Sequence, residues 1–120
     1  MMNADDFRRL ALALPGAEEG AHMGHPDFRA NGRIFASLHQ GDATGMVKLA
    51  PEEQAEFVRL HPEVFAPASG AWGRQGSTIV TLAAAGAPVI RTALTMAYEQ
   101  VMAAPEGRLA RRPSRTRTRR

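Results

Sequence analysis

The feature of this sequence that most limits its fold is the dipeptide Asn31-Gly32, which stands between two segments that mix apolar and polar residues. Both residues accept the positive φ angles of a type I′ turn, the tight turn that joins two antiparallel strands. Residues 27–30 lead into this turn and residues 33–39 leave it. The sequence therefore predicts a β-hairpin near the middle of the chain's first half.

Further strands are expected on both sides of this hairpin. A turn at Gly41-Asp42 and a strand over 45–49 extend it into an antiparallel meander, and a shorter strand is predicted around 19–23. Alternation along residues 33–39 places Phe35 and Ser37 on the same face of the sheet. The first half of the chain is thus predicted to form four sequential strands.

The remaining periodic segments are helical, apart from one β-branched run at 77–82 that predicts a strand. Asn3 is a good helix cap, and Phe7, Leu10, Ala11 and Leu14 fall on one helical face before Pro15-Gly16. Two more helices are predicted to begin at Pro51 and at Ala87-Pro88, because proline is favoured in the first turn.

Residues 65–76 are rich in glycine, proline and alanine and are predicted to form a loop or an irregular edge. The predicted order is therefore α-β-β-β-β-α-β-α. Such an order has no β-α-β rhythm, so it favours an α+β fold in which helices pack on one face of an antiparallel sheet.

The composition changes near residue 104. Residues 105–120 hold seven arginines and one acid, a net charge of +6, whereas residues 1–104 hold eight basic and eleven acidic residues, a net charge of −3. With one leucine, the last stretch cannot bury enough apolar surface to offset the entropy of ordering. We therefore expect a domain over 1–104 and a disordered arginine-rich tail over 105–120.

Several function classes find no support in the sequence. The 120 residues include no cysteine, which leaves no disulfide, thiolate nucleophile or cysteine-based zinc site. The N-terminus does not resemble a signal peptide, and no apolar run is long enough to span a membrane. No phosphate-binding loop or nucleophile elbow is present. We expect a cytoplasmic protein that is not an enzyme and that uses no cofactor.

The arginine-rich tail and the segment around the single tryptophan are the main candidates for binding. A flexible polycation neutralises phosphates and releases counterions, although a solubilising extension without a role is an equal alternative. Trp72 and Arg74 stand among three glycines and suit stacking on a base, but burial of Trp72 against the sheet is favoured. The candidate nucleic-acid-binding residues are Arg29, Arg33, Lys48, Trp72, Arg74, Arg111, Arg112, Arg115, Arg117, Arg119 and Arg120.

The histidines form a weaker candidate. His22 or His25 could meet His39 across the hairpins, and such imidazoles would suit zinc, iron or nickel. Neither a helical His-x-x-x-His pair nor a paired carboxylate accompanies them, so dispersed surface histidines are favoured and no metal is expected. Together with Asp27 and Arg29, the histidines are also compatible with a patch that holds an anion.

A series of short segments, in this order and spacing, resembles the MmcQ/YjbR family of small bacterial proteins. The matching segments are 12–19 (LALPGAEE), 24–29 (GHPDFR), 32–36 (GRIFA), 48–54 (KLAPEEQ), 62–65 (PEVF) and 70–76 (GAWGRQG). The resemblance implies a fold like that of frataxin and CyaY, with helices on one face of an antiparallel sheet. It also implies DNA binding through a winged arrangement.

The leading expectation is a non-catalytic protein that binds DNA or another nucleic acid. The alternative is a domain that binds a small molecule or a protein partner without a nucleic-acid role, which the negative charge of residues 1–104 favours. Iron binding of the frataxin kind would need a cluster of exposed acids that the sequence does not show.

Overall fold

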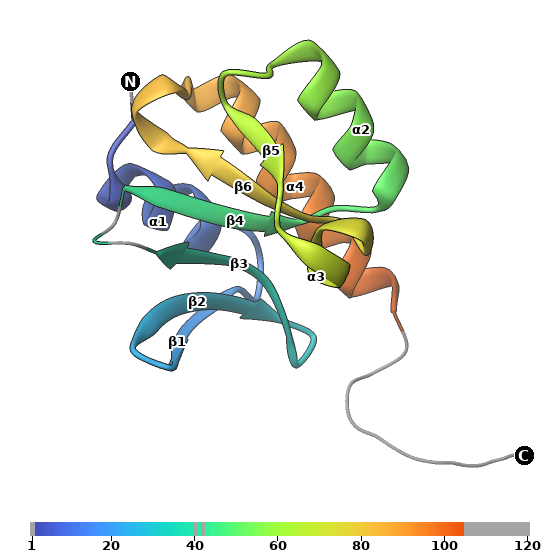
Figure 1. The fold of residues 1–120 in the computed structure, drawn as a ribbon. Helices are drawn as coiled ribbons and strands as arrows, with labels where there is room; N and C mark the ends of the chain where they lie inside the picture. Colours follow the sequence, from blue (N-terminus) through green and yellow to red (C-terminus); the bar gives the residue numbers. More distant parts are fainter. Residues whose placement is uncertain (1, 40, 42, 105–120) are drawn as a thin grey trace, which may run out of the picture.

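The computed structural model describes residues 2–39, 41 and 43–104, and it confirms the predicted α+β class (Figure 1). Its strands are β1 (Glu18–His22), β2 (His25–Ala30), β3 (Arg33–His39), β4 (Thr44–Lys48), β5 (Phe65–Pro67) and β6 (Ser77–Thr81). Its helices are α1 (Ala4–Leu12), α2 (Pro51–Leu60), α3 (Gly70–Arg74) and α4 (Ala87–Ala103), with a 3₁₀ turn, η1 (Leu82–Ala84), before α4. The strands form one antiparallel sheet in the order β1-β2-β3-β4-β6-β5.

The first helix begins where its capping residue predicts. The Asn3 side chain accepts a hydrogen bond from the Asp6 backbone N–H at 2.9 Å, and the Asp6 carboxylate accepts one from the Asn3 N–H at 3.1 Å. Two of the free N–H groups at this end are therefore satisfied. Phe7 and Ala11 of the predicted apolar face are buried, so α1 is confirmed.

The central hairpin is also confirmed, because Asn31 and Gly32 both have positive φ angles, of 56° and 70°. Asn31 has a second role that the turn pattern does not show. Its side-chain amide donates to the backbone carbonyls of Val101 and Ala104, at 2.8 and 3.2 Å. The hairpin tip thereby holds the C-terminal end of α4 against the sheet.

The loop or irregular edge predicted for residues 65–76 is confirmed only in part: β5 is the edge strand of the sheet, but the segment also contains α3, which the sequence pattern does not predict. Its glycines allow close approach of backbones rather than flexibility. A Cβ on Gly73 would lie 1.8 Å from the carbonyl oxygen of Ala68, and one on Gly76 would lie 1.7 Å from that of Leu49. The predicted element order therefore lacks one strand and one helix.

Strict alternation along β3 is wrong as well. The register pairs Phe28 with Ala36 and Arg29 with Ile34, so Phe35 is an extra residue at a β-bulge. Phe35 is fully buried, whereas Ser37 lines a hollow on the other side of the sheet. The bulge therefore turns Phe35 toward the helices, where its ring lies edge-on to that of Tyr98 in α4.

The helices α1, α2 and α4 pack on one face of the sheet, as predicted. The Phe7 ring of α1 lies so close to Gly45 of β4 that a Cβ there would meet it at 3.0 Å. Phe57 of α2 contacts Phe65 of β5, with ring centroids 5.0 Å apart. Figure 1 shows α1 and α4 behind the sheet and α3 in front of it, near one end. Among the described residues, α3 is the one helix that reaches the opposite face, which we call the open face.

Candidate functional site

One row of directly paired residues crosses the open face. Asp27 of β2 pairs with Ser37 of β3, Ser37 with Met46 of β4, and Met46 with Ile79 of β6. Paired residues in neighbouring strands share a face, so this row runs across the middle of the sheet. Gly20 of β1 extends the row beyond Asp27. The row supplies the polar and apolar floor of the candidate site.

A hollow of about 300 Å³ opens over this row. It is lined by His22, Ser37, His39, Met46, Ala68, Ser69, Trp72, Ser77 and Ile79. The lining residues come from β1, β3, β4, β6 and the start of α3, so five elements converge there. Ligand sites in proteins are typically hollows of this kind, with an apolar lining and a few fixed polar groups.

Trp72 stands at the rim of the hollow and is 68% exposed. The predicted burial of Trp72 against the core is therefore wrong. Gly73, its neighbour, is the residue that packs inward, and the buried Gln54 amide donates to the Gly73 carbonyl at 2.9 Å. This anchoring fixes α3 by its backbone and leaves the large indole available to a ligand.

Asp27 is a fully buried carboxylate beside the hollow. Arg29 donates to it through Nε at 2.7 Å and through a second guanidinium nitrogen at 3.1 Å, and Nδ1 of His22 lies 2.7 Å from Oδ2. The Arg29 hydrogen bond, followed by that of His22, lowers the pKa of Asp27 against the opposing effect of burial. Asp27 is therefore ionised at neutral pH and holds Arg29 and His22 in place.

Ser37 and His39 form a second polar pair. The Ser37 hydroxyl lies 2.5 Å from Nε2 of His39, and the His39 ring lies 4.8 Å from that of His25. Burial, followed by the nearby charges of His25 and His22, lowers the pKa of His39 below its ordinary value of 6.5. His39 is therefore neutral at pH 7, and its ring offers both a hydrogen-bond donor and an acceptor.

This pKa shift predicts that the His39 ring is half protonated below pH 6.5. Because the folded-state pKa is depressed, the stability from neutral His39 is present above the unfolded pKa and is lost as the pH falls. An NMR titration of the ring resonances measures the pKa directly. A His39→Gln variant, which cannot titrate, should show a weaker loss of stability below pH 6.5; an identical pH profile would contradict the shift.

The structure places the candidate binding residues in different surroundings. Trp72 lines the hollow, and Lys48 pairs in register with Ser77, which also lines it. Arg29 forms an ion pair with Asp27, Arg74 is exposed at the end of α3, and Arg33 is exposed as the first residue of β3. The six tail arginines Arg111, Arg112, Arg115, Arg117, Arg119 and Arg120 lie outside the described residues.

Two residues of the site, Ser37 and Asp27, are not among the nucleic-acid-binding residues that the sequence predicts. Ser37 carries no sequence signal, because its place in the hollow depends on the β-bulge at Phe35. Asp27 belongs to the anion patch that the sequence suggests, and its burial follows from Arg29 two residues later on the same face. An Asp-x-Arg spacing in a strand is the signal that points to such a pair.

Charge is distributed unevenly between the two faces. Asp5, Asp6, Glu52, Glu53, Glu56 and Glu99 lie on α1, α2 and α4. The open face carries Arg29 and Lys48, with Arg74 beside it on α3. The same helices also carry Arg8, Arg9, Arg59 and Arg91, so their net charge is −2, whereas the open face keeps a small positive net charge after Asp27 offsets one of its cations.

The described residues offer neither a membrane-spanning helix nor a metal-binding cluster. No helix among residues 2–39, 41 and 43–104 is long and apolar enough to cross a membrane. In the same part of the chain, no three histidine, aspartate or glutamate residues are grouped so that they could hold a metal ion.

Comparison with known proteins agrees with this description. The crystal structure of protein DR2400 from Deinococcus radiodurans, which is described as a DUF419 domain, has a TM-score of 0.72 and 22% sequence identity to the chain. The alignment covers 86% of this chain and 80% of that one, which shows a shared fold. No curated protein matches the chain. The family model named YjbR matches residues 12–100, so the predicted resemblance is confirmed and the chain belongs to the YjbR family.

Proposed function

We propose that this protein binds nucleic acid through the open face of its sheet and catalyses no reaction. The observation that carries the proposal is the exposed Trp72 at the rim of the hollow, beside the cationic residues Lys48 and Arg74. An open sheet face with an exposed aromatic side chain is a recurrent platform for unpaired bases. We therefore expect a preference for single-stranded over duplex nucleic acid.

The geometry supports a division of roles. The indole of Trp72 stacks on a base, the hollow of about 300 Å³ accepts its edge, and His39, which is held by the buried Ser37 hydroxyl, offers a hydrogen bond to it. Lys48 and Arg74 contact phosphates, because neither forms an ion pair with a carboxylate among the described residues. The tail arginines add attraction that carries no sequence information.

Replacing Trp72 by alanine tests the proposal most directly. Loss of one stacked base is expected to weaken binding of a labelled single strand roughly five- to 150-fold, which corresponds to ~1–3 kcal/mol. Fluorescence anisotropy at fixed salt measures the change. Leu12→Ala, which removes a partly exposed apolar side chain from α1 on the other side of the molecule, serves as the matched control.

Unchanged affinity in the Trp72→Ala variant would reject the open face as the binding site. The salt dependence separates the contribution of the tail, because each phosphate contact that is lost flattens the dependence of log affinity on log salt. A chain that ends at residue 104 contains every described helix and strand. If it retains Trp72-dependent binding with a shallower slope, the domain and the tail both contribute.

A second candidate function is the binding of a small anionic molecule in the same hollow. The specific observation in its favour is the fixed group formed by Asp27, Arg29 and His22 at its edge, because such prearranged polar groups orient small ligands. A metabolite that co-purifies with the native protein and is released by Trp72→Ala, with no binding of nucleic acid, would favour this candidate.

We make two finer proposals, of which the first rests on the family resemblance. The sheet with three helices on one face is of the frataxin and CyaY type, and the protein acts in the cytoplasm. The absence of cysteine from all 120 residues is compatible with a reducing compartment, where no disulfide is needed.

A further inference from the structure

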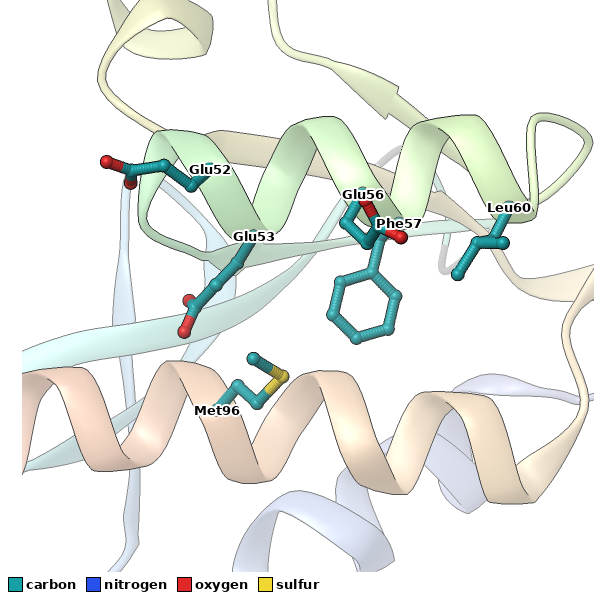
Figure 2. A pocket seen from close by; sticks show the side chains of 6 residues that line it. All are labelled: Glu52, Glu53, Glu56, Phe57, Leu60 and Met96. Atoms are coloured by element: carbon teal, nitrogen blue, oxygen red, sulfur yellow. The ribbon is translucent and has the colours of Figure 1, made fainter.

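An apolar groove lies between α2 and α4, on the helical side of the molecule. It has a volume of about 410 Å³ and is lined by Glu52, Glu53, Glu56, Phe57, Leu60 and Met96. Figure 2 shows the Phe57 ring pointing down toward Met96 of α4, with the three glutamates along α2 above. Leu60, at the end of the groove, is 54% exposed. The groove therefore offers an apolar floor with an acidic rim.

The rim is only partly neutralised within the described residues. Glu53 accepts a hydrogen bond from the Ala50 backbone N–H at 3.0 Å, and Glu56 forms an ion pair with Arg59. Glu52 has no partner among the described residues. A ligand that carries both an apolar side chain and several cations would match this groove better than an apolar ligand alone.

The chain itself contains a segment of this description. In residues 105–120, Leu109 is the one large apolar side chain, and its neighbours in the sequence include Arg108, Arg111 and Arg112. We propose that residues 108–112 of the same chain dock in the groove, with Leu109 on Phe57 and Met96 and the arginines on the glutamate rim. The tail carries +6 and residues 1–104 carry −3, so the complementarity extends beyond the groove.

The distances permit this intramolecular contact. Met96 lies seven residues before the end of α4 at Ala103, which is about 10 Å along the helix axis. Leu109 follows Ala104 by five residues, which can span roughly 17 Å when extended. Glu52 and Glu53 lie on the side of the groove toward which α4 continues after Met96 (Figure 2). A chain that turns back at residue 105 therefore meets the acidic rim before the apolar floor.

The same chain is a better occupant than a second copy. A segment joined to its site by only a few residues has an effective concentration in about the millimolar range. A second molecule at micromolar concentration cannot compete with it unless its intrinsic affinity is far higher. This inference does not depend on the proposed function, because its test contains no nucleic acid.

A spin label on the tail tests the contact. Because the chain has no cysteine, Ser114→Cys provides one attachment site in the full-length protein, five residues beyond Leu109. In a ¹⁵N-labelled sample, the amide signals of α2 and of Met96 are expected to lose most of their intensity, while those of β1 keep theirs. Adding Leu109→Ser should restore the α2 signals, and the neighbouring Ala110→Ser should not.

Four outcomes would contradict the inference. The label could broaden the amide signals of the open face instead of those of α2, or it could broaden the signals of no region selectively. In a mixture of two chains, one with ¹⁵N and one with the spin label, the α2 signals of the ¹⁵N chain could also be broadened. If broadening occurs only in this mixture, the groove binds the tail of another copy. If the α2 signals are still broadened in the Glu52→Gln, Glu56→Gln double variant, the acidic rim does not contribute to docking of the tail. Both residues are exposed, so these substitutions leave the fold intact.

Discussion

Replacing Gly73 by alanine is expected to destabilise the domain by about 3 kcal/mol or more, which lowers the melting temperature by about 12 °C or more. The added Cβ would lie 1.8 Å from the carbonyl oxygen of Ala68, and backbone atoms cannot yield as a flexible side chain does. Either α3 moves away from residue 68 or it unfolds. Thermal unfolding followed by circular dichroism measures the effect.

Gly86→Ala is the matched control for this prediction. Gly86 has an ordinary φ angle of −103°, and its nearest contact for an added Cβ is 3.9 Å away. Its replacement is expected to cost no more than about 1 kcal/mol, through the weaker capping of α4 by alanine. A Gly73→Ala protein that melts within a few degrees of Gly86→Ala would show that α3 does not pack on residue 68 as described.

The second large effect is expected at Asp27. Asp27→Asn removes the ionised partner of Arg29 and His22 from a buried position, and we expect a loss of about 2–3 kcal/mol at pH 7. The loss is smaller than for a fully buried ion pair because the Arg29 side chain is 44% exposed and recovers water contacts. Urea denaturation measures the change.

The pH dependence of this difference has a definite sign. The pKa of Asp27 is depressed below 3.8 in the folded state, so its contribution is fully present above the unfolded pKa and is lost as the pH falls through the folded value. The gap between wild type and Asp27→Asn should therefore stay constant above about pH 5 and close as the solution becomes more acidic. Glu63→Gln, at an exposed site, should differ from wild type by less than about 0.5 kcal/mol. A gap that widens with acid would contradict the role of Asp27.

Much of the fold is predictable because its signals are local. The reciprocal hydrogen bonds of Asn3 and Asp6 and the two positive φ angles at Asn31-Gly32 depend on residues that are close in the chain. The strand and helix within residues 65–76 were not predicted, for the opposite reason. Gly73 and Gly76 are required by contacts with Ala68 and Leu49, so their role is visible only once distant backbones are brought together.

The candidate site was less predictable than the fold. Exposure of Trp72 reverses the usual preference of a large aromatic side chain, and it follows from the anchoring of Gly73 by Gln54, nineteen residues away in the sequence. Burial of Asp27 likewise reverses the usual preference of a carboxylate and follows from its pairing with Arg29. Single-residue propensities anticipate neither case, because each depends on a specific partner; for Asp27 that partner is two residues away and leaves the Asp-x-Arg spacing as a signal, whereas the partner of Gly73 is distant in the sequence.

The two outer strands of the sheet have a consequence for the behaviour of the protein at high concentration. β5 has three residues and ends at Pro67, and β1 begins with the exposed acids Glu18 and Glu19. Short edges, proline and charge all discourage the addition of a strand from another molecule. Lateral growth of the sheet into aggregates is therefore disfavoured at both edges, although among the described residues only the short α3 covers part of the open face.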